Sequence, residues 1–234
     1  AQKVVTLAPY RMDEFARRCK ESDKCEAYPF VADPNGNFYH FVERVSDGNS
    51  KWDGMYYKEG FTASSTLAQQ GNTRYDAANT GNGDRSVTWC EGVKGHGIGE
   101  RVNMRITTQG LYSEDGIGFT ELMIVNGYAK NQTAWKNNSR VKAMKLYVGG
   151  KHWYNLNLKD VIKPQVFKLE TTIEPDKFGK KVAIPAEWEQ PDWIKSSTAY
   201  QTDLSFEIAE IYAGDKFDDT CITGIALEGY SKVY

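Results

Sequence analysis

The chain has 234 residues, of which 40% are hydrophobic and 13% aromatic, enough for the core of one large β domain or of one domain with an N-terminal extension. Its 29 basic and 31 acidic residues give a formal charge of −2, which excludes a general electrostatic attraction to nucleic acid or to anionic membranes. No apolar run approaches the roughly 18 residues of a membrane-spanning helix, so we expect no membrane insertion.

The first residues predict an extension rather than a separate domain. The start at Ala1, in the sequence AQK, is typical of a chain cut after a small-residue signal-peptidase site, which favours an exported protein. Residues 11–20 predict a short amphipathic helix, and residues 29–45 predict a hairpin around a DPNGN turn. Because so few aliphatic residues would form only a marginal core, we expect residues 1–52 to pack on a main domain spanning residues 53–234.

Beyond Gly54 the pattern is one of strands and loops. Apolar and polar side chains alternate through residues 102–106, 141–148 and 204–211. The polar stretch 69–86, rich in Gly and Asn, predicts a long loop with a short helical turn at residues 74–78. Helical periodicity is weak here, so the sequence predicts an all-β domain, an antiparallel β-sandwich.

Three separated segments carry a family resemblance. They are VTWCEGVKGHGIGERVNMRI at 87–106, IVNGYAKNQTAWKNNSRVKAMKLYV at 124–148 and LSFEIAEIYAGDKFDDTCITGIA at 204–226. In this order they resemble the discoidin-like, galactose-binding-like module of bacterial secreted NAD glycohydrolases, over roughly residues 55–228. The resemblance implies a jelly-roll β-sandwich that binds glycans and serves translocation without catalytic machinery. It also implies a secreted, periplasmic or cell-surface bacterial protein.

One stretch departs from the family pattern. Family members tend to carry an Asp-Gly-Asp turn just before the Trp, whereas the stretch here is NTGNGDRSV, with Asp84 as its only carboxylate. The resemblance therefore does not carry a cation or ligand contact over to that turn. The sequence also contains no recognisable NAD glycohydrolase catalytic domain, so that activity is not expected.

Four cysteines admit three pairings. The resemblance makes the segments that hold Cys90 and Cys221 neighbouring strands, which predicts a disulfide between them. Cys19 and Cys25 are close enough in sequence for a second, local disulfide. The alternative is four free thiols in a cytosolic protein. A zinc site is disfavoured because the spacing is not CxxC and the three histidines follow no ligand pattern.

The loop at residues 128–135 combines aromatic, amide and cationic side chains, as sugar sites do. Side chains from other loops are candidates to converge with it at one end of a sandwich, although an aromatic residue in such a loop can equally serve packing. Trp89, which opens a strand, is expected in the core with its indole N–H bonded to a backbone acceptor. The candidate ligand contacts are Tyr75, Arg85, His96, Tyr128, Lys130, Asn131 and Trp135.

The run AGDKFDDT contains Asp215, Asp218 and Asp219, which suggests a structural calcium site. Calcium takes about six to eight oxygen ligands from carboxylates, carbonyls and water. Lys216 lies within the run, and the alternative is a solvated acidic turn. Apart from this possible calcium ion, no cofactor is expected.

Signatures of common enzyme families are absent from the sequence. It contains no GxSxG, HExxH or GxxxxGKS motif, and GHGIGE at 95–100 enters a predicted strand rather than a helix, unlike a dinucleotide-binding loop. We therefore predict a non-catalytic module whose loops bind a glycan or a similar polar ligand on a cell surface. The alternatives are a protein-interaction or envelope-assembly factor that docks through residues 1–52, and a glycoside hydrolase with a carboxylate pair.

Overall fold

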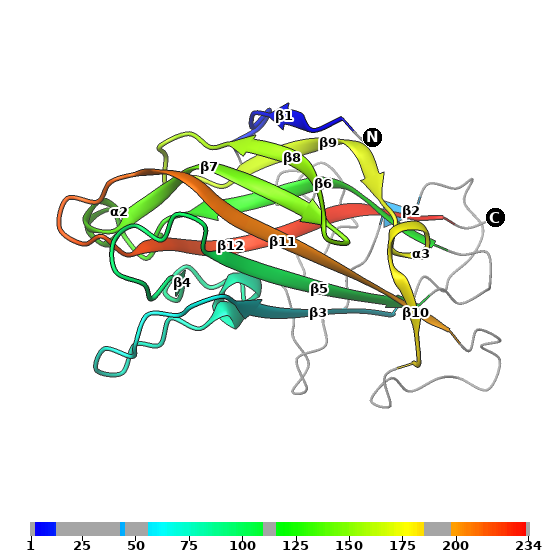
Figure 1. Cartoon of the computed structure of the whole chain (residues 1–234), viewed down its shortest axis with the longest axis horizontal. Coiled ribbons are helices and arrows are strands. Elements are labelled where there is room, and N and C mark those ends of the chain that lie inside the picture. Colours follow the sequence, from blue (N-terminus) through cyan, green and yellow to red (C-terminus); the bar gives the residue numbers. More distant parts are fainter. Residues whose placement is uncertain (1–2, 13–42, 45–55, 110–115, 185–197, 233–234) are drawn as a thin grey trace, which may run out of the picture.

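The computed structural model describes residues 3–12, 43–44, 56–109, 116–184 and 198–232. These residues form a mostly β domain with a few short helical turns (Figure 1). The helical segments are η1 (Ala77–Gly81), α2 (Gln132–Asn137) and α3 (Pro175–Phe178). In the part of the chain described, no helix has the length and apolar character needed to cross a membrane.

The strands account for most of the described chain. In chain order they are β1 (Val5–Leu7), β2 (Glu43–Arg44), β3 (Tyr56–Ala63), β4 (Trp89–Cys90), β5 (Arg101–Gln109), β6 (Gly116–Asn126), β7 (Ser139–Val148), β8 (Lys151–Asn157), β9 (Gln165–Ile173), β10 (Lys180–Val182), β11 (Ala199–Tyr212) and β12 (Thr220–Lys232).

The hydrogen-bonded order β3-β5-β11-β7-β12-β6-β9 divides into two layers. One layer contains β3, β5, β11, β7 and β8, paired antiparallel. The other contains β12, β6 and β9, also antiparallel, with β4 on the outer side of β12. The layers join through a two-residue parallel pairing, in which Thr220 and Cys221 lie opposite Ser139 and Arg140. This arrangement confirms the predicted all-β sandwich.

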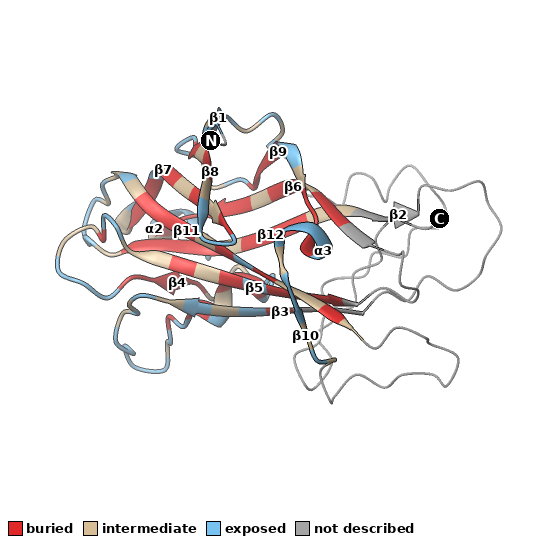
Figure 2. Ribbon diagram, turned by 45° about the vertical axis from the view of Figure 1, so that its right-hand side comes forward, coloured by how far each residue is buried: buried red, intermediate tan, exposed pale blue. Residues whose placement is uncertain are grey.

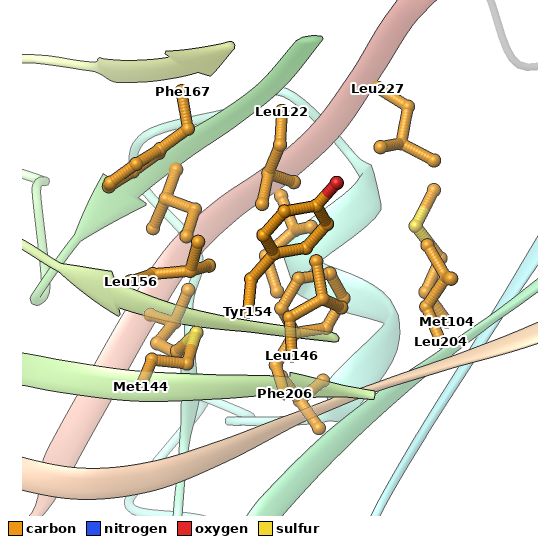
Figure 3. Close-up of a cluster of buried hydrophobic side chains, with 14 of the residues drawn as sticks. Met104, Leu122, Met144, Leu146, Tyr154, Leu156, Phe167, Leu204, Phe206 and Leu227 are labelled. Carbon is orange, nitrogen blue, oxygen red and sulfur yellow. The ribbon is translucent and has the colours of Figure 1, made fainter. Parts of the chain in front are cut away.

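The core lies between the two layers and follows the predicted alternation. Buried and exposed residues alternate along the strands (Figure 2), because successive side chains of a strand point to opposite faces. Figure 3 shows side chains of both layers meeting, among them Phe206 from β11 and Leu122 from β6. Tyr154 is also buried, and its hydroxyl donates to the carbonyl of Thr171 and accepts from its amide, so the polar end of the ring is satisfied.

The N-terminal segment bridges the open edges of the two layers. β1 pairs in parallel with β8, with Val5 opposite Tyr154. Farther along, the amide of Tyr10 donates to the carbonyl of Val166 in β9, and the amide of Val166 donates to the carbonyl of Arg11. Arg11 also forms an ion pair with Glu121 of β6. Residues 3–12 therefore connect β8 of one layer to β9 of the other.

Some predictions for the N-terminal region cannot be compared with the structure. Beyond Met12 the predicted helix at residues 11–20 lies outside the described residues, as do Cys19 and Cys25. Of the predicted hairpin at residues 29–45, only β2 is described, and it pairs in parallel with β12. A helical turn was predicted at residues 74–78, but η1 spans Ala77–Gly81, so the predicted start was wrong by three residues.

Candidate ligand-binding pocket

A disulfide holds the loop end of the sandwich together. Cys90 and Cys221 lie opposite each other in the β4–β12 pair, with their Cα atoms 4.1 Å apart, and both are fully buried. The amide of Gly127 donates to the carbonyl of Cys221 at 3.0 Å, so the segment around residue 127 lies beside the disulfide. The predicted Cys90–Cys221 pairing is confirmed, and all three segments that carry the resemblance meet here.

The residues around the disulfide have internal partners. Trp89 is fully buried and its indole N–H donates to the carbonyl of Ser65 at 3.0 Å, as predicted. The buried Glu91 accepts from the amide of Val93 at 2.8 Å and from that of Thr220 at 3.1 Å. Burial raises the pKa of Glu91, and these two hydrogen bonds oppose that rise. Glu91 therefore fixes the loop that follows it against the start of β12.

Helix α2 is capped at its start by Asn131 and is held on the domain by its buried Trp135 side chain. The Asn131 side chain accepts from the amide of Ala134 at 2.8 Å, which satisfies one of the unpaired donors of the first turn. Trp135 is buried, and its indole N–H donates to the carbonyl of Asn126 at 3.0 Å. The guanidinium of Arg140 stacks on the Trp135 ring, 4.6 Å from the ring centroid.

Arg140 connects α2 to the neighbouring loops. Its Nε and Nη2 atoms donate to the two carboxylate oxygens of Asp160 at 3.0 and 2.9 Å. Its Nη1 atom donates to the carbonyls of Lys136, Asn138 and Ala213 at 3.0–3.3 Å. Gly127 passes close by with φ of +74°, and a Cβ there would lie 2.6 Å from Cγ of Arg140. Only glycine accommodates both that backbone conformation and that approach.

Between α2, the 67–75 loop and the turn before β12 lies a pocket of about 360 Å³. The rings of Tyr75 and Tyr128 meet edge to face in its wall, with centroids 6.3 Å apart, and pack on the disulfide. The Tyr128 hydroxyl donates to the carbonyl of Ser86 at 3.1 Å. The lining residues are Leu67, Gln70, Thr73, Tyr75, Tyr128, Lys130, Asn131, Thr133, Ala134, Asn137, Asn138, Phe217 and Asp219.

Two charged residues line the pocket, and they differ in burial. Lys130 is exposed, whereas Asp219 is half-buried directly before β12. Burial raises the pKa of Asp219, its own backbone amide opposes the rise by a hydrogen bond, and the like charge of Asp218 adds to it. Burial also raises the pKa of Tyr75, and the negative charge of Asp219 acts in the same direction. Among the described residues, Asp219 has no ion-pair partner.

The structure brings together four of the seven candidate ligand contacts, Tyr75, Tyr128, Lys130 and Asn131. Trp135 is a packing residue beneath α2 and does not line the pocket. Arg85 lies half-exposed on the loop before β4, outside the pocket lining. His96 also lies outside it, with Nδ1 at 3.1 Å from the Ser139 hydroxyl and 3.2 Å from the Asp218 carbonyl.

Several lining residues had no signal in the sequence. Gln70 and Thr73 belong to a polar loop without periodicity, and Phe217 and Asp219 belong to a run interpreted as a calcium site or a solvated turn. Only their position opposite α2 identifies them. The amide and hydroxyl side chains of α2, including Thr133 and Asn137, follow from the helix itself, which the sequence did not predict.

The three aspartates do not form a metal site together. Within the described residues, no group of three or more His, Cys, Asp or Glu side chains is arranged to hold a metal ion. Asp215 and Asp218 are exposed, and Asp219 lines the pocket. Asp84 accepts from the amide and the hydroxyl of Ser86 at 2.8 and 2.7 Å, so its carboxylate stabilises its own turn.

The geometry agrees with a comparison with known families. The family model of the NAD glycohydrolase translocation F5/8 type C domain matches residues 52–228. The chain belongs to this family. The F5/8 type C domain is the discoidin-like module whose resemblance the sequence carries, and the matched family is a non-catalytic binding or translocation module. Together with the buried disulfide, membership indicates a protein outside the cytoplasm.

Other comparisons add little. No curated protein matches the chain. A solved structure of the arabinofuranosyltransferase AftD from mycobacteria aligns with 81% of this chain at 12% identity and a TM-score of 0.43. The chain spans 13% of the length of that protein.

Proposed function

We propose that this protein is a non-catalytic module that captures a glycan, or a similar polar ligand, in the pocket between α2, the 67–75 loop and the turn before β12. The observation that carries the proposal is the composition of the pocket wall. Two tyrosine rings stand beside amide, hydroxyl and charged side chains in a space of about 360 Å³. Pockets of roughly this size, part apolar and part polar, are typical of small-ligand sites.

The chemistry of the wall suits a sugar. A sugar ring presents C–H groups that pack on an aromatic ring, while its hydroxyls seek donors and acceptors. Lys130 supplies donors, Asp219 supplies acceptors, and Asn137 supplies both. The Oδ1 atom of Asn131 is already bonded to α2, so this residue shapes the pocket rather than contributing that oxygen to a ligand.

Rigidity supports a binding role. The wall rests on the disulfide, and α2 is fixed by the buried Arg140 and Trp135. A site formed before the ligand arrives loses less conformational entropy on binding. The described residues therefore offer a pocket that needs no large rearrangement before it can bind.

A glycan array followed by calorimetry tests the proposal, with and without calcium because a calcium requirement remains a prediction. Thr133→Tyr should fill the pocket and abolish binding, because Thr133 lines it and is exposed. Gln132→Tyr is the matched control, since Gln132 is exposed on the same helix but does not line the pocket. An array without any bound glycan, or equal binding by both variants, would reject the site.

The alternative of docking through residues 1–52 predicts a different outcome. Deleting that region should then abolish capture of a protein partner while glycan binding survives. The ion pair of Arg11 with Glu121 and the pairing of β1 with β8 show that part of this region is already engaged by the sheet. For this reason the pocket is the stronger candidate.

A further inference from the structure

We propose that the ligand of this pocket carries a positively charged amino group, which the carboxylate of Asp219 receives. The preferred class is a glycan that contains hexosamine units with free amines, rather than neutral or N-acetylated units. The inference rests on the proposed function, because it specifies the ligand of the same pocket.

The backbone on both sides of Asp219 is held by hydrogen bonds and by the disulfide. Its carbonyl accepts from the amide of Ser139 at 3.0 Å, and the amide of the next residue, Thr220, donates to Glu91. The residue after that is Cys221, in the disulfide. The backbone that carries the carboxylate is therefore fixed on both sides, so the negative charge sits at a defined place in the pocket wall.

In the described part of the chain, no cationic side chain pairs with the Asp219 carboxylate. Within the described chain, Asp219 forms no ion pair with any Lys, Arg or His, although it is half-buried. Lys130 lines the same pocket but is exposed and forms no ion pair with Asp219. A partly buried, unpaired charge is unfavourable, and an incoming ammonium group relieves that cost.

The side chains around Asp219 favour a cation over an anion. The rings of Tyr75 and Tyr128 line the pocket, and aromatic rings attract ammonium groups. Phe217 also lines the pocket, but the ammonium of Lys216 already lies 5.0 Å from its ring centroid. Asp218 lies beside Asp219 and adds negative charge.

Calorimetry on a matched pair of probes tests the inference. A fully deacetylated glucosamine oligosaccharide and its fully N-acetylated counterpart differ in the charged amine, at a pH where the amine is protonated. We expect the deacetylated probe to bind about tenfold more tightly, the effect of one charge-assisted hydrogen bond. Added salt should reduce the difference.

Variants assign the preference to Asp219. Asp219→Asn should remove the preference for the amine while binding of the N-acetylated probe persists. Asp215→Asn is the matched control, because Asp215 is exposed in the same turn but does not line the pocket. Thermal unfolding of each variant checks that the fold is retained, and if Asp219→Asn fails to fold, the two probes on the unmodified protein decide.

The outcomes separate this inference from the proposed function. Equal affinity for both probes, or tighter binding of the N-acetylated probe, overturns the amine preference and leaves a neutral-glycan module. A preference that persists in Asp219→Asn overturns the role of Asp219. If the protein binds neither probe and no glycan on the array, the proposed function fails and this inference fails with it.

Discussion

The loop end of the sandwich and the outer face of β5 and β11 both contain an arginine bonded to an aspartate, in very different surroundings. At the loop end the Arg140 side chain is 8% exposed and also bonds three carbonyls. On the outer face the Arg105 side chain is 58% exposed, and its partner Asp203 is 49% exposed. The arginine–aspartate pair is thus part of the internal structure at the loop end and part of the solvated surface on the outer face.

This difference indicates which of the two regions contributes more to the stability of the domain. A buried charge must be fully bonded, since any unsatisfied part is costly, whereas an exposed pair contributes little. The loop end contains both Arg140 and the Cys90–Cys221 disulfide, and the pocket residues Tyr75 and Tyr128 pack on the disulfide. Changes at the loop end should therefore cost far more stability than matched changes on the outer face.

The largest expected effect is loss of the disulfide. Replacing Cys90 and Cys221 together by Ser removes a link that spans 131 positions of sequence. The chain-entropy model gives a loss of about 5 kcal/mol in the free energy of unfolding. Guanidinium titration of the double variant measures it. A loss below about 1 kcal/mol would mean that the remaining contacts already restrain the loop end.

The next effect concerns Glu59, a buried carboxylate on β3 that lies opposite the core residue Ile106 of β5. Burial raises the pKa of Glu59 to about 8, from 4.5. In the unfolded chain the Glu59 carboxyl ionises above about pH 4.5, whereas in the folded protein it keeps its proton up to about pH 8. The free energy of unfolding should therefore fall as pH rises from about 4.5 to 8. Glu59→Gln should remove this slope, so that its stability relative to the unmodified protein rises by on the order of 4 kcal/mol between about pH 4.5 and pH 8. Urea titrations at several pH values measure it, and a variant with the same slope as the unmodified protein would contradict it.

A direct test of the comparison replaces each arginine by methionine. Arg140→Met leaves Asp160 and three carbonyls without their donor, and we expect a loss of about 3 kcal/mol. Arg105→Met is the matched control and should cost less than about 1 kcal/mol. Thermal unfolding compares the two. Equal losses would show that the loop end is no more dependent on its arginine than the outer face.

The smallest effect concerns Glu207 on the outer face. Burial alone would raise the pKa of Glu207, but hydrogen bonds from Lys145, Arg101 and Tyr147 lower it below its usual value. The stability that ionised Glu207 contributes is present above about pH 4.5 and is lost as pH falls through the lowered pKa. Glu207→Gln should therefore reduce the free energy of unfolding that is lost on acidification by less than about 1 kcal/mol. Acid titration followed by circular dichroism measures this, and unchanged sensitivity would assign it to other carboxylates.

The sequence predicted the fold better than the pocket. Alternation through residues 102–106 and 204–211 identified core strands, because period two follows from strand geometry. The Cys90–Cys221 pairing required the family resemblance to place the two strands side by side. The parallel pairing of β1 with β8 could not be predicted, since three residues carry no signal for a distant partner.

Trp135 illustrates the limit for the pocket. An aromatic residue in a polar loop resembles a sugar contact, yet the capping bond of Asn131 starts a helix that turns the indole inward onto Arg140. Trp135 lies four positions after Asn131, about one helical turn along, but nothing in the local sequence states which face of the helix is buried. Gln70 and Thr73 reach the pocket through a loop whose path depends on contacts remote in sequence.

The N-terminal bridge has a consequence for how this domain is defined. The family match begins at residue 52, but residues 3–12 cover the backbone edges of β8 and β9. A fragment cut at residue 52 would present unprotected amides and carbonyls along both edges, and such edges recruit strands from neighbouring molecules. The region that the family model matches and the region that keeps these strand edges covered therefore begin at different residues of this chain.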